Sequence, residues 1–188
     1  MSWQFNPYAH TLLVTTVFAI LMGVFIWPRR RLPGGLSLII LSMTAAVWAL
    51  GNALETAATD PAIKLTIAKV GYFGVAFTPL LFLVFVLDYT QRIEWLNPRR
   101  LIMLAGLPFL TWIMALTNDL YGMQWREVTY DPLQNILIYR YGPWFVITAA
   151  NAYIYMITAS VLLARSFMHV QSWYRRQIAF LLPSILFP

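Results

Sequence analysis

Two charged residues near the ends of long apolar segments are the first candidates for chemistry in this sequence. Lys69 lies about one helical turn inside an apolar run from Leu65 to Leu87, which at about 23 residues is long enough to cross a bilayer. A lysine at that depth is costly unless it reaches the interface or meets an acid. Glu55 closes the preceding apolar run, across a short connection. We therefore expect a Lys69–Glu55 pair, with snorkelling of both side chains to water as the alternative.

A stripe of polar side chains recurs at helical spacing in the apolar run that follows Pro143, and its members share one helical face. They are Thr148, Asn151, Tyr155 and Thr158. Polar groups inside a bundle need partners in one another, in water or in a ligand. Two interpretations stay open: interhelical hydrogen bonds worth about 1 kcal/mol each, or a small-ligand pocket beneath the connection 118–142. The candidate ligand-binding residues are Trp48, Asn52, Glu55, Lys69, Tyr72, Asn118, Trp125, Trp144, Thr148, Asn151 and Tyr155.

The sequence carries no recognisable catalytic motif: no glycine-rich phosphate loop, no HExxH and no nucleophile elbow. It has no cysteine, which excludes disulfides, thiolate metal sites and cysteine nucleophiles. The two histidines, His10 and His169, fall on opposite faces of the membrane and cannot share one metal or haem. Lys69 could carry a Schiff base, but no other feature supports that chemistry. We expect no cofactor, metal or catalytic residue here, and leave open whether the whole protein is an enzyme.

The composition is that of an integral membrane protein. The chain is 60% hydrophobic and only 11% charged, with a mean hydropathy of +0.66, whereas soluble domains are about 25% charged. Its formal net charge of +6 does not indicate a nucleic-acid partner, because the arginines cluster between apolar runs, as topology signals do. The lipid bilayer is therefore the expected partner.

The apolar runs predict an all-α polytopic bundle of transmembrane helices that forms a single domain over residues 1–188. The expected helices cover about 9–27, 36–55, 61–89, 98–117, 143–165 and 174–188. Asp60-Pro61 and Asn97-Pro98 are typical of a helix start, with a capping side chain before a proline at the first helical position. The last run rises only about 22 Å against a core of roughly 30 Å. We therefore expect a truncated sixth helix, a seventh beyond Pro188 and a longer protein.

The long connection 118–142 has its own pattern. The stretches Trp125–Tyr130 and Ile136–Tyr141 have strand-like composition and flank an Asp131-Pro132 turn. This pattern predicts a small extracytoplasmic β-hairpin.

The distribution of basic residues predicts the orientation. Three loops on one side hold nine of them: Arg29, Arg30, Arg31, Arg92, Arg99, Arg100, Arg165, Arg175 and Arg176. The other side holds four: Lys64, Lys69, Arg126 and Arg140. Since basic loops stay in the cytoplasm, we expect a multi-pass protein of the cell (inner or plasma) membrane with an extracytoplasmic N-terminus.

The order of several short motifs resembles the seven-transmembrane N-terminal sensor region of bacterial and archaeal histidine kinases. The matching pieces are Asn6-Pro7-Tyr8, Trp48-Ala49-Leu50-Gly51, Leu54-Glu55, Ala68-Lys69, Tyr72-Phe73-Gly74, Pro79, Leu116-Thr117-Asn118, Gly122, Trp125, Tyr141-Gly142-Pro143-Trp144-Phe145 and Tyr174-Arg175-Arg176-Gln177. The chain departs from the pattern at Asp119-Leu120-Tyr121, where the family often has Pro-Leu-His, and at Gly71 and Thr148, where it often has an acid and a histidine.

The resemblance implies a sensory input domain of a two-component histidine kinase or, less often, of a diguanylate cyclase. Such a domain would detect a small ligand or a membrane signal in its outer half and pass it to a cytoplasmic output domain, through which the protein would form a homodimer. The alternative is a small-solute transporter or channel-like protein that uses the same polar interior. A transporter should carry an internal repeat with discontinuous helices, and no convincing repeat relates residues 10–90 to 100–188.

Overall fold

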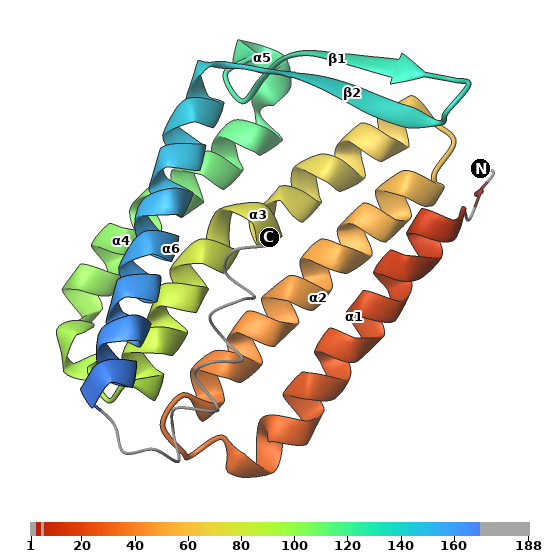
Figure 1. Ribbon diagram of the computed structural model, residues 1–188. Helices are drawn as coiled ribbons and strands as arrows, with labels where there is room; N and C mark the ends of the chain where they lie inside the picture. Colours follow the sequence, from red (N-terminus) through yellow and green to blue (C-terminus); the bar gives the residue numbers. More distant parts are fainter. Residues whose placement is uncertain (1–2, 5, 170–188) are drawn as a thin grey trace.

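The computed structural model describes residues 3, 4 and 6–169 as a bundle of long helices capped at one end by a two-stranded sheet (Figure 1). The long helices are α1 (Pro7–Ile26), α2 (Gly35–Ala57), α3 (Pro61–Tyr89), α4 (Pro98–Leu116) and α6 (Pro143–His169). All five are long and apolar enough to span a membrane. The prediction of a polytopic α-helical membrane protein is confirmed. The helix expected at 174–188 lies outside the described residues.

Side-chain caps fix where three of these helices begin. The Asn6 side chain accepts a hydrogen bond from the backbone N–H of Ala9 at 2.8 Å, and α1 starts at Pro7. Asp60 and Asn97 cap α3 and α4 in the same way, each before a proline. The first N–H groups of a helix have no acceptor within the helix. Proline has no N–H, so placing it at the first helical position leaves no donor unpaired.

Helix α3 occupies the centre of the bundle, where it packs against α2, α4 and α6, whereas α1 packs mainly against α2. The main apolar core lies between α3 and α6. It contains Leu80, Leu83, Phe85, Val86, Leu87, Tyr155, Ala159 and Leu163. This core lies toward the end of the bundle where the α1–α2 and α3–α4 connections turn (Figure 1).

Glycines set the close approach of α2 to α3. A Cβ atom on Gly74 would lie 2.3 Å from the Cβ atom of Trp48, so only glycine fits at this position. One turn away, a Cβ on Gly51 would lie 3.3 Å from the Cα atom of Gly71. Small residues let membrane helices pack backbone against backbone, and here they bring α2 and α3 together below the sheet.

The sheet is the predicted hairpin. Strands β1 (Trp125–Asp131) and β2 (Ile136–Tyr141) pair antiparallel and lie across the helix ends, after the short helix α5 (Asn118–Tyr121) (Figure 1). The hairpin is tied to the connection between α2 and α3: the amide of Asn135 donates to the carbonyl of Ala58 at 3.1 Å, and the hydroxyl of Tyr130 donates to the carbonyl of Thr59 at 3.4 Å. The strands therefore form a lid anchored on the bundle.

Candidate functional site

A cavity of about 360 Å³ lies beneath the hairpin. Its walls come from five parts of the fold: the start of α1, the last turns of α2, the first half of α3, the hairpin formed by β1 and β2, and the start of α6. Gly51 and Gly71, which meet across α2 and α3, line it together with Ala68. The absence of side chains on the two glycines leaves space that larger residues would occupy.

Aromatic rings make up much of the cavity wall. Trp125 packs edge-on against Tyr72, with ring centroids 5.2 Å apart, and lies 5.2 Å from the ring of Tyr139. Tyr141 stacks on Phe145 with centroids 3.8 Å apart. All five of these residues line the cavity. Since Trp125 is only 4% exposed, the hairpin side of the wall is fixed by packing.

Glu55 is the acidic residue of the lining, and Tyr139 holds it. The hydroxyl of Tyr139 donates to Oε1 of Glu55 at 2.8 Å, which joins strand β2 to α2. Burial raises the pKa of the Tyr139 hydroxyl above its ordinary value, and the charge of Glu55 and this hydrogen bond raise it further. Tyr139 therefore stays protonated and remains a hydrogen-bond donor to the carboxylate.

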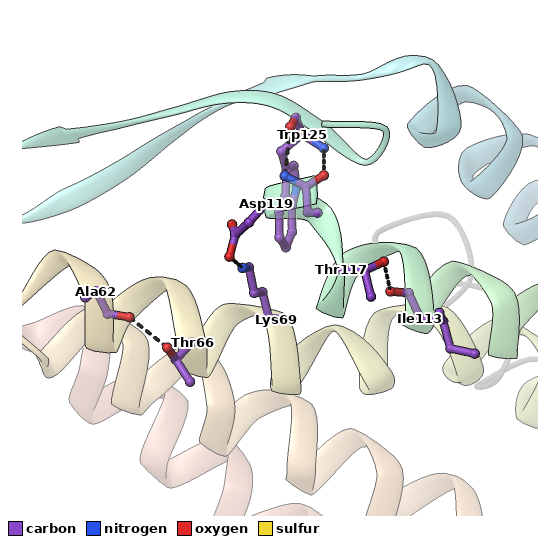
Figure 2. Close-up of polar contacts among 8 residues, drawn as sticks. Ala62, Thr66, Lys69, Ile113, Thr117, Asp119 and Trp125 are labelled. Atoms are coloured by element: carbon purple, nitrogen blue, oxygen red, sulfur yellow. Dashed lines mark hydrogen bonds and ion pairs between the residues drawn. The ribbon is translucent and has the colours of Figure 1, made fainter. Parts of the chain in front are cut away.

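The expected Lys69–Glu55 pair is wrong. Lys69 instead forms an ion pair with Asp119 of α5 (Figure 2). The reason is the path of the chain between α4 and the hairpin: α5 places a carboxylate over the first half of α3, on the side of Lys69, while Glu55 is taken by Tyr139. From the sequence, the acid in the neighbouring segment was the expected partner of Lys69, whereas the actual partner lies fifty residues away along the chain.

The lysine that does lie close to Glu55 is Lys64. Its ammonium donates to the carbonyl of Glu55 at 2.7 Å and to that of Thr56 at 3.3 Å, and the residue is 1% exposed. Both carbonyls belong to the last turn of α2, where unpaired acceptors and the negative end of the helix dipole favour a cation. Lys64 therefore closes the end of α2.

A buried polar network beside the cavity holds the base of the hairpin. Gln124, which is 0% exposed, donates to the hydroxyl of Tyr72 and accepts from the hydroxyl of Thr148 at 3.3 Å. Trp144 donates to the hydroxyl of Thr111 at 3.2 Å, and that hydroxyl lies 3.5 Å from the hydroxyl of Thr148. The network thus connects α3, α4 and α6 to the segment that leads into β1.

Asn118 organises the turn before β1. Its side-chain oxygen accepts from the backbone N–H groups of Gln124 and Trp125, and its amide donates to the carbonyl of Trp125 at 2.9 Å. The hydrogen bonds made by the backbone of Trp125 are drawn in Figure 2, above the Lys69–Asp119 pair. By contrast, the hydroxyls of Thr66 and Thr117 each bond the carbonyl four residues earlier in their own helix (Figure 2).

The structure divides the predicted site residues into two groups. Trp48, Asn52, Glu55, Tyr72 and Trp125 line the cavity. The other six lie outside its lining: Lys69 in the ion pair, Asn118, Trp144 and Thr148 in the polar contacts around Gln124, and Asn151 and Tyr155 farther along α6. The structure therefore brings five of the eleven candidates to one cavity and places the other six outside its lining.

The residues of the polar stripe on α6 also differ in their hydrogen-bond partners. Tyr155 donates to the carbonyl of Leu104 at 2.7 Å, so it binds α6 to α4. Thr158 is exposed and bonds the carbonyl of Ile154 in its own helix. For Thr148 and Tyr155, interhelical hydrogen bonding is what the geometry supports.

Several cavity and network residues were missed by the sequence reasoning. They are Tyr8, Gly51, Ala68, Gly71, Gln124, Tyr139, Tyr141 and Phe145. Alternation along β2 places Tyr139 and Tyr141 on the same face of the strand, which is a signal that the hairpin prediction already contained. Gln124 gives no comparable signal, because a glutamine in a connection is ordinarily solvated. In the described part of the chain, no three His, Asp or Glu side chains gather as metal ligands.

The comparisons with known proteins agree with the architecture. The family model described as the N-terminal 7TM region of histidine kinase matches residues 11–188. No curated protein and no solved structure matches the chain. Because the family match covers nearly the whole sequence and the fold is a bundle of membrane-spanning helices, the chain belongs to the family of N-terminal 7TM regions of histidine kinases.

Proposed function

We propose that this region is the sensory input domain of a two-component histidine kinase and that a small ligand or membrane signal acts at the cavity beneath the hairpin. The observation that carries the proposal is the make-up of the cavity wall, which comes from five separate elements, α1, α2, α3, the hairpin and α6. A ligand that contacts all of them has different affinities for different packings of the bundle. Differential affinity is what a ligand needs in order to shift a conformational equilibrium.

The central helix is the route by which such a shift leaves the cavity. The first half of α3 lines the cavity, and the second half belongs to the apolar core with α6. Pro79 lies between the two halves, where the missing N–H and the ring weaken the helix and allow it to bend. A change of packing at the cavity therefore alters how α3 meets α6 and, through the following helices, the output domain.

The proposed orientation places the cavity outside the cytoplasm. The connections that carry Arg29–Arg31 and Arg92–Arg100 lie at the end of the bundle opposite the hairpin (Figure 1). Basic loops are retained in the cytoplasm, so the N-terminus and hairpin face the exterior of the cell membrane. A homodimer of the full-length kinase would form through its output domain.

Filling the cavity tests this proposal. Ala68 lines the cavity on α3, whereas Val70 of the same helix is exposed. In the full-length kinase in native membranes, Ala68→Trp should hold autophosphorylation at one level under conditions that modulate the unsubstituted protein. The control Val70→Trp should leave the modulation intact. If Ala68→Trp responds like the unsubstituted kinase while the protein is folded and inserted, the cavity is not the input site.

A further inference from the structure

The aromatic residues of the cavity come from every side. The helices supply Tyr8, Trp48 and Tyr72, the hairpin supplies Trp125, Tyr139 and Tyr141, and Phe145 begins α6. These are seven of the fourteen lining residues, in a chain that is 16% aromatic. The faces of such rings carry negative potential and attract cations, particularly organic ones that give up their water easily.

The charged group of the lining also favours a cation over an anion. Glu55 is the one Asp, Glu, Lys or Arg among the described residues that line the cavity. The two neighbouring lysines are engaged elsewhere: Lys64 on the carbonyls that end α2, and Lys69 on Asp119. Lys64 also interacts electrostatically with Glu55, but its charge faces the acceptors and the negative dipole end of α2.

An anionic ligand does not suit this lining. Carboxylates and phosphates are bound by Arg or Lys forks or by free backbone N–H groups at a helix start. The lining contributes neither a lysine nor an arginine. Two helix starts, those of α1 and α6, also border the cavity, but their N–H groups are engaged: that of Ala9 donates to the Asn6 side chain, and those of Trp144 and Phe145 donate to the carbonyls of Met123 and Gly142. The rings and the carboxylate instead complement an alkylated ammonium group.

From this arrangement we propose that the cavity binds a small organic cation, with a quaternary or alkylated ammonium group held among the aromatic rings and paired with Glu55. The inference rests on the proposed role of the cavity as the ligand site and adds the chemical class of the ligand. Tyr139 positions the carboxylate through its hydrogen bond to Oε1. Among the rings that line the cavity, those of Tyr8 and Tyr141 are the most exposed.

A pair of probes with one shape and different charge tests the inference. Choline and its neutral carbon isostere 3,3-dimethylbutan-1-ol are titrated into the full chain in nanodiscs, and binding is followed by calorimetry and by the fluorescence of the cavity tryptophans. Choline should bind at least about tenfold more tightly than the isostere, since the ring and carboxylate attraction acts on the charge alone. Equal affinity of the two probes, or no binding of choline, overturns the inference.

Substitutions at Glu55 and Trp48 separate the contribution of the charge from that of the rings. Glu55→Gln keeps an acceptor for Tyr139 but removes the charge, and should weaken choline by about tenfold or more while leaving the isostere unchanged. Glu94→Gln, at an exposed acid outside the lining, should change neither. Trp48→Phe retains a ring and should bind choline better than Trp48→Leu. If Glu55→Gln fails to fold, this tryptophan pair still decides the question, because equal affinities would contradict a role for the rings.

The outcome separates this inference from the proposed function. If Ala68→Trp abolishes the modulation of the kinase but choline binds no better than its isostere, the cavity is the input site and its ligand is not a cation. If choline binds with the expected preference and Ala68→Trp leaves the modulation intact, the cavity binds cations without serving as the input site.

Discussion

The two halves of α3 are built differently, although one continuous helix contains both. The half near the hairpin lines the cavity and bears buried polar side chains, Lys64, Lys69 and Tyr72, each held by a specific partner. The half beyond Pro79 packs Leu80, Leu83 and Val86 against α6. The comparison teaches that one end of the bundle is fixed by close packing, whereas the other surrounds the cavity.

The packed half should be the more sensitive to truncation. Leu83 is 5% exposed in the core with α6, so Leu83→Ala should destabilise the bundle by about 2 kcal/mol, at the low end of the range for buried leucines because lipid is itself apolar. Thermal unfolding in detergent measures this. Leu101→Ala, at an exposed leucine on α4, is the control, and an equal loss from both would mean that the core is not closely packed.

Removing the hub of the polar network should cost somewhat less. Gln124→Ala removes one hydrogen-bond partner from each of the hydroxyls of Tyr72 and Thr148, a loss of about 1–2 kcal/mol. The hairpin should loosen locally, which hydrogen exchange of the β1 amides reports. The matched variant Gln134→Ala, at an exposed residue of the hairpin turn, should leave exchange unchanged. Unaltered β1 protection in Gln124→Ala would show that the network does not hold the hairpin.

The smallest expected effect is at Tyr139. Tyr139→Phe removes one hydrogen bond to Glu55, worth about 1 kcal/mol. The raised pKa of Tyr139 in the folded protein adds a pH dependence. Stability from this group is complete below the ordinary tyrosine pKa of about 10 and is lost as pH rises beyond it, because the unfolded chain ionises first.

The decline of stability above about pH 10 should accordingly be shallower in Tyr139→Phe than in the unsubstituted protein. Tyr153→Phe, at an exposed tyrosine of α6, serves as the comparison for the general effect of removing a phenol. Identical alkaline declines in the unsubstituted protein and Tyr139→Phe would contradict the burial of this hydroxyl.

The elements could be predicted from the sequence because their signals are local. Apolar run length fixed the spans, the cap-and-proline pairs at Asp60-Pro61 and Asn97-Pro98 fixed two helix starts, and the composition around Asp131-Pro132 indicated the hairpin. All of these depend on residues close together in the chain.

The partners of the site residues could not be predicted, because they depend on how distant segments meet. Lys69 pairs with an acid fifty positions away, and Gln124 is buried only because α5 turns the chain over α3. The same limit explains the missed glycines. Gly51 and Gly71 line the cavity because α2 and α3 pack together at its level, and their separate positions in the sequence do not reveal this packing.

The central claim, that the cavity end of the bundle faces the exterior, can be tested most directly by single-cysteine labelling. The chain has no cysteine of its own, so Leu133→Cys in the hairpin turn, 95% exposed, and Arg31→Cys at the opposite end each supply one thiol. A membrane-impermeant maleimide applied to intact cells should label Leu133→Cys at once and Arg31→Cys only after permeabilisation. Labelling of Arg31→Cys in intact cells, with Leu133→Cys protected, would contradict the account.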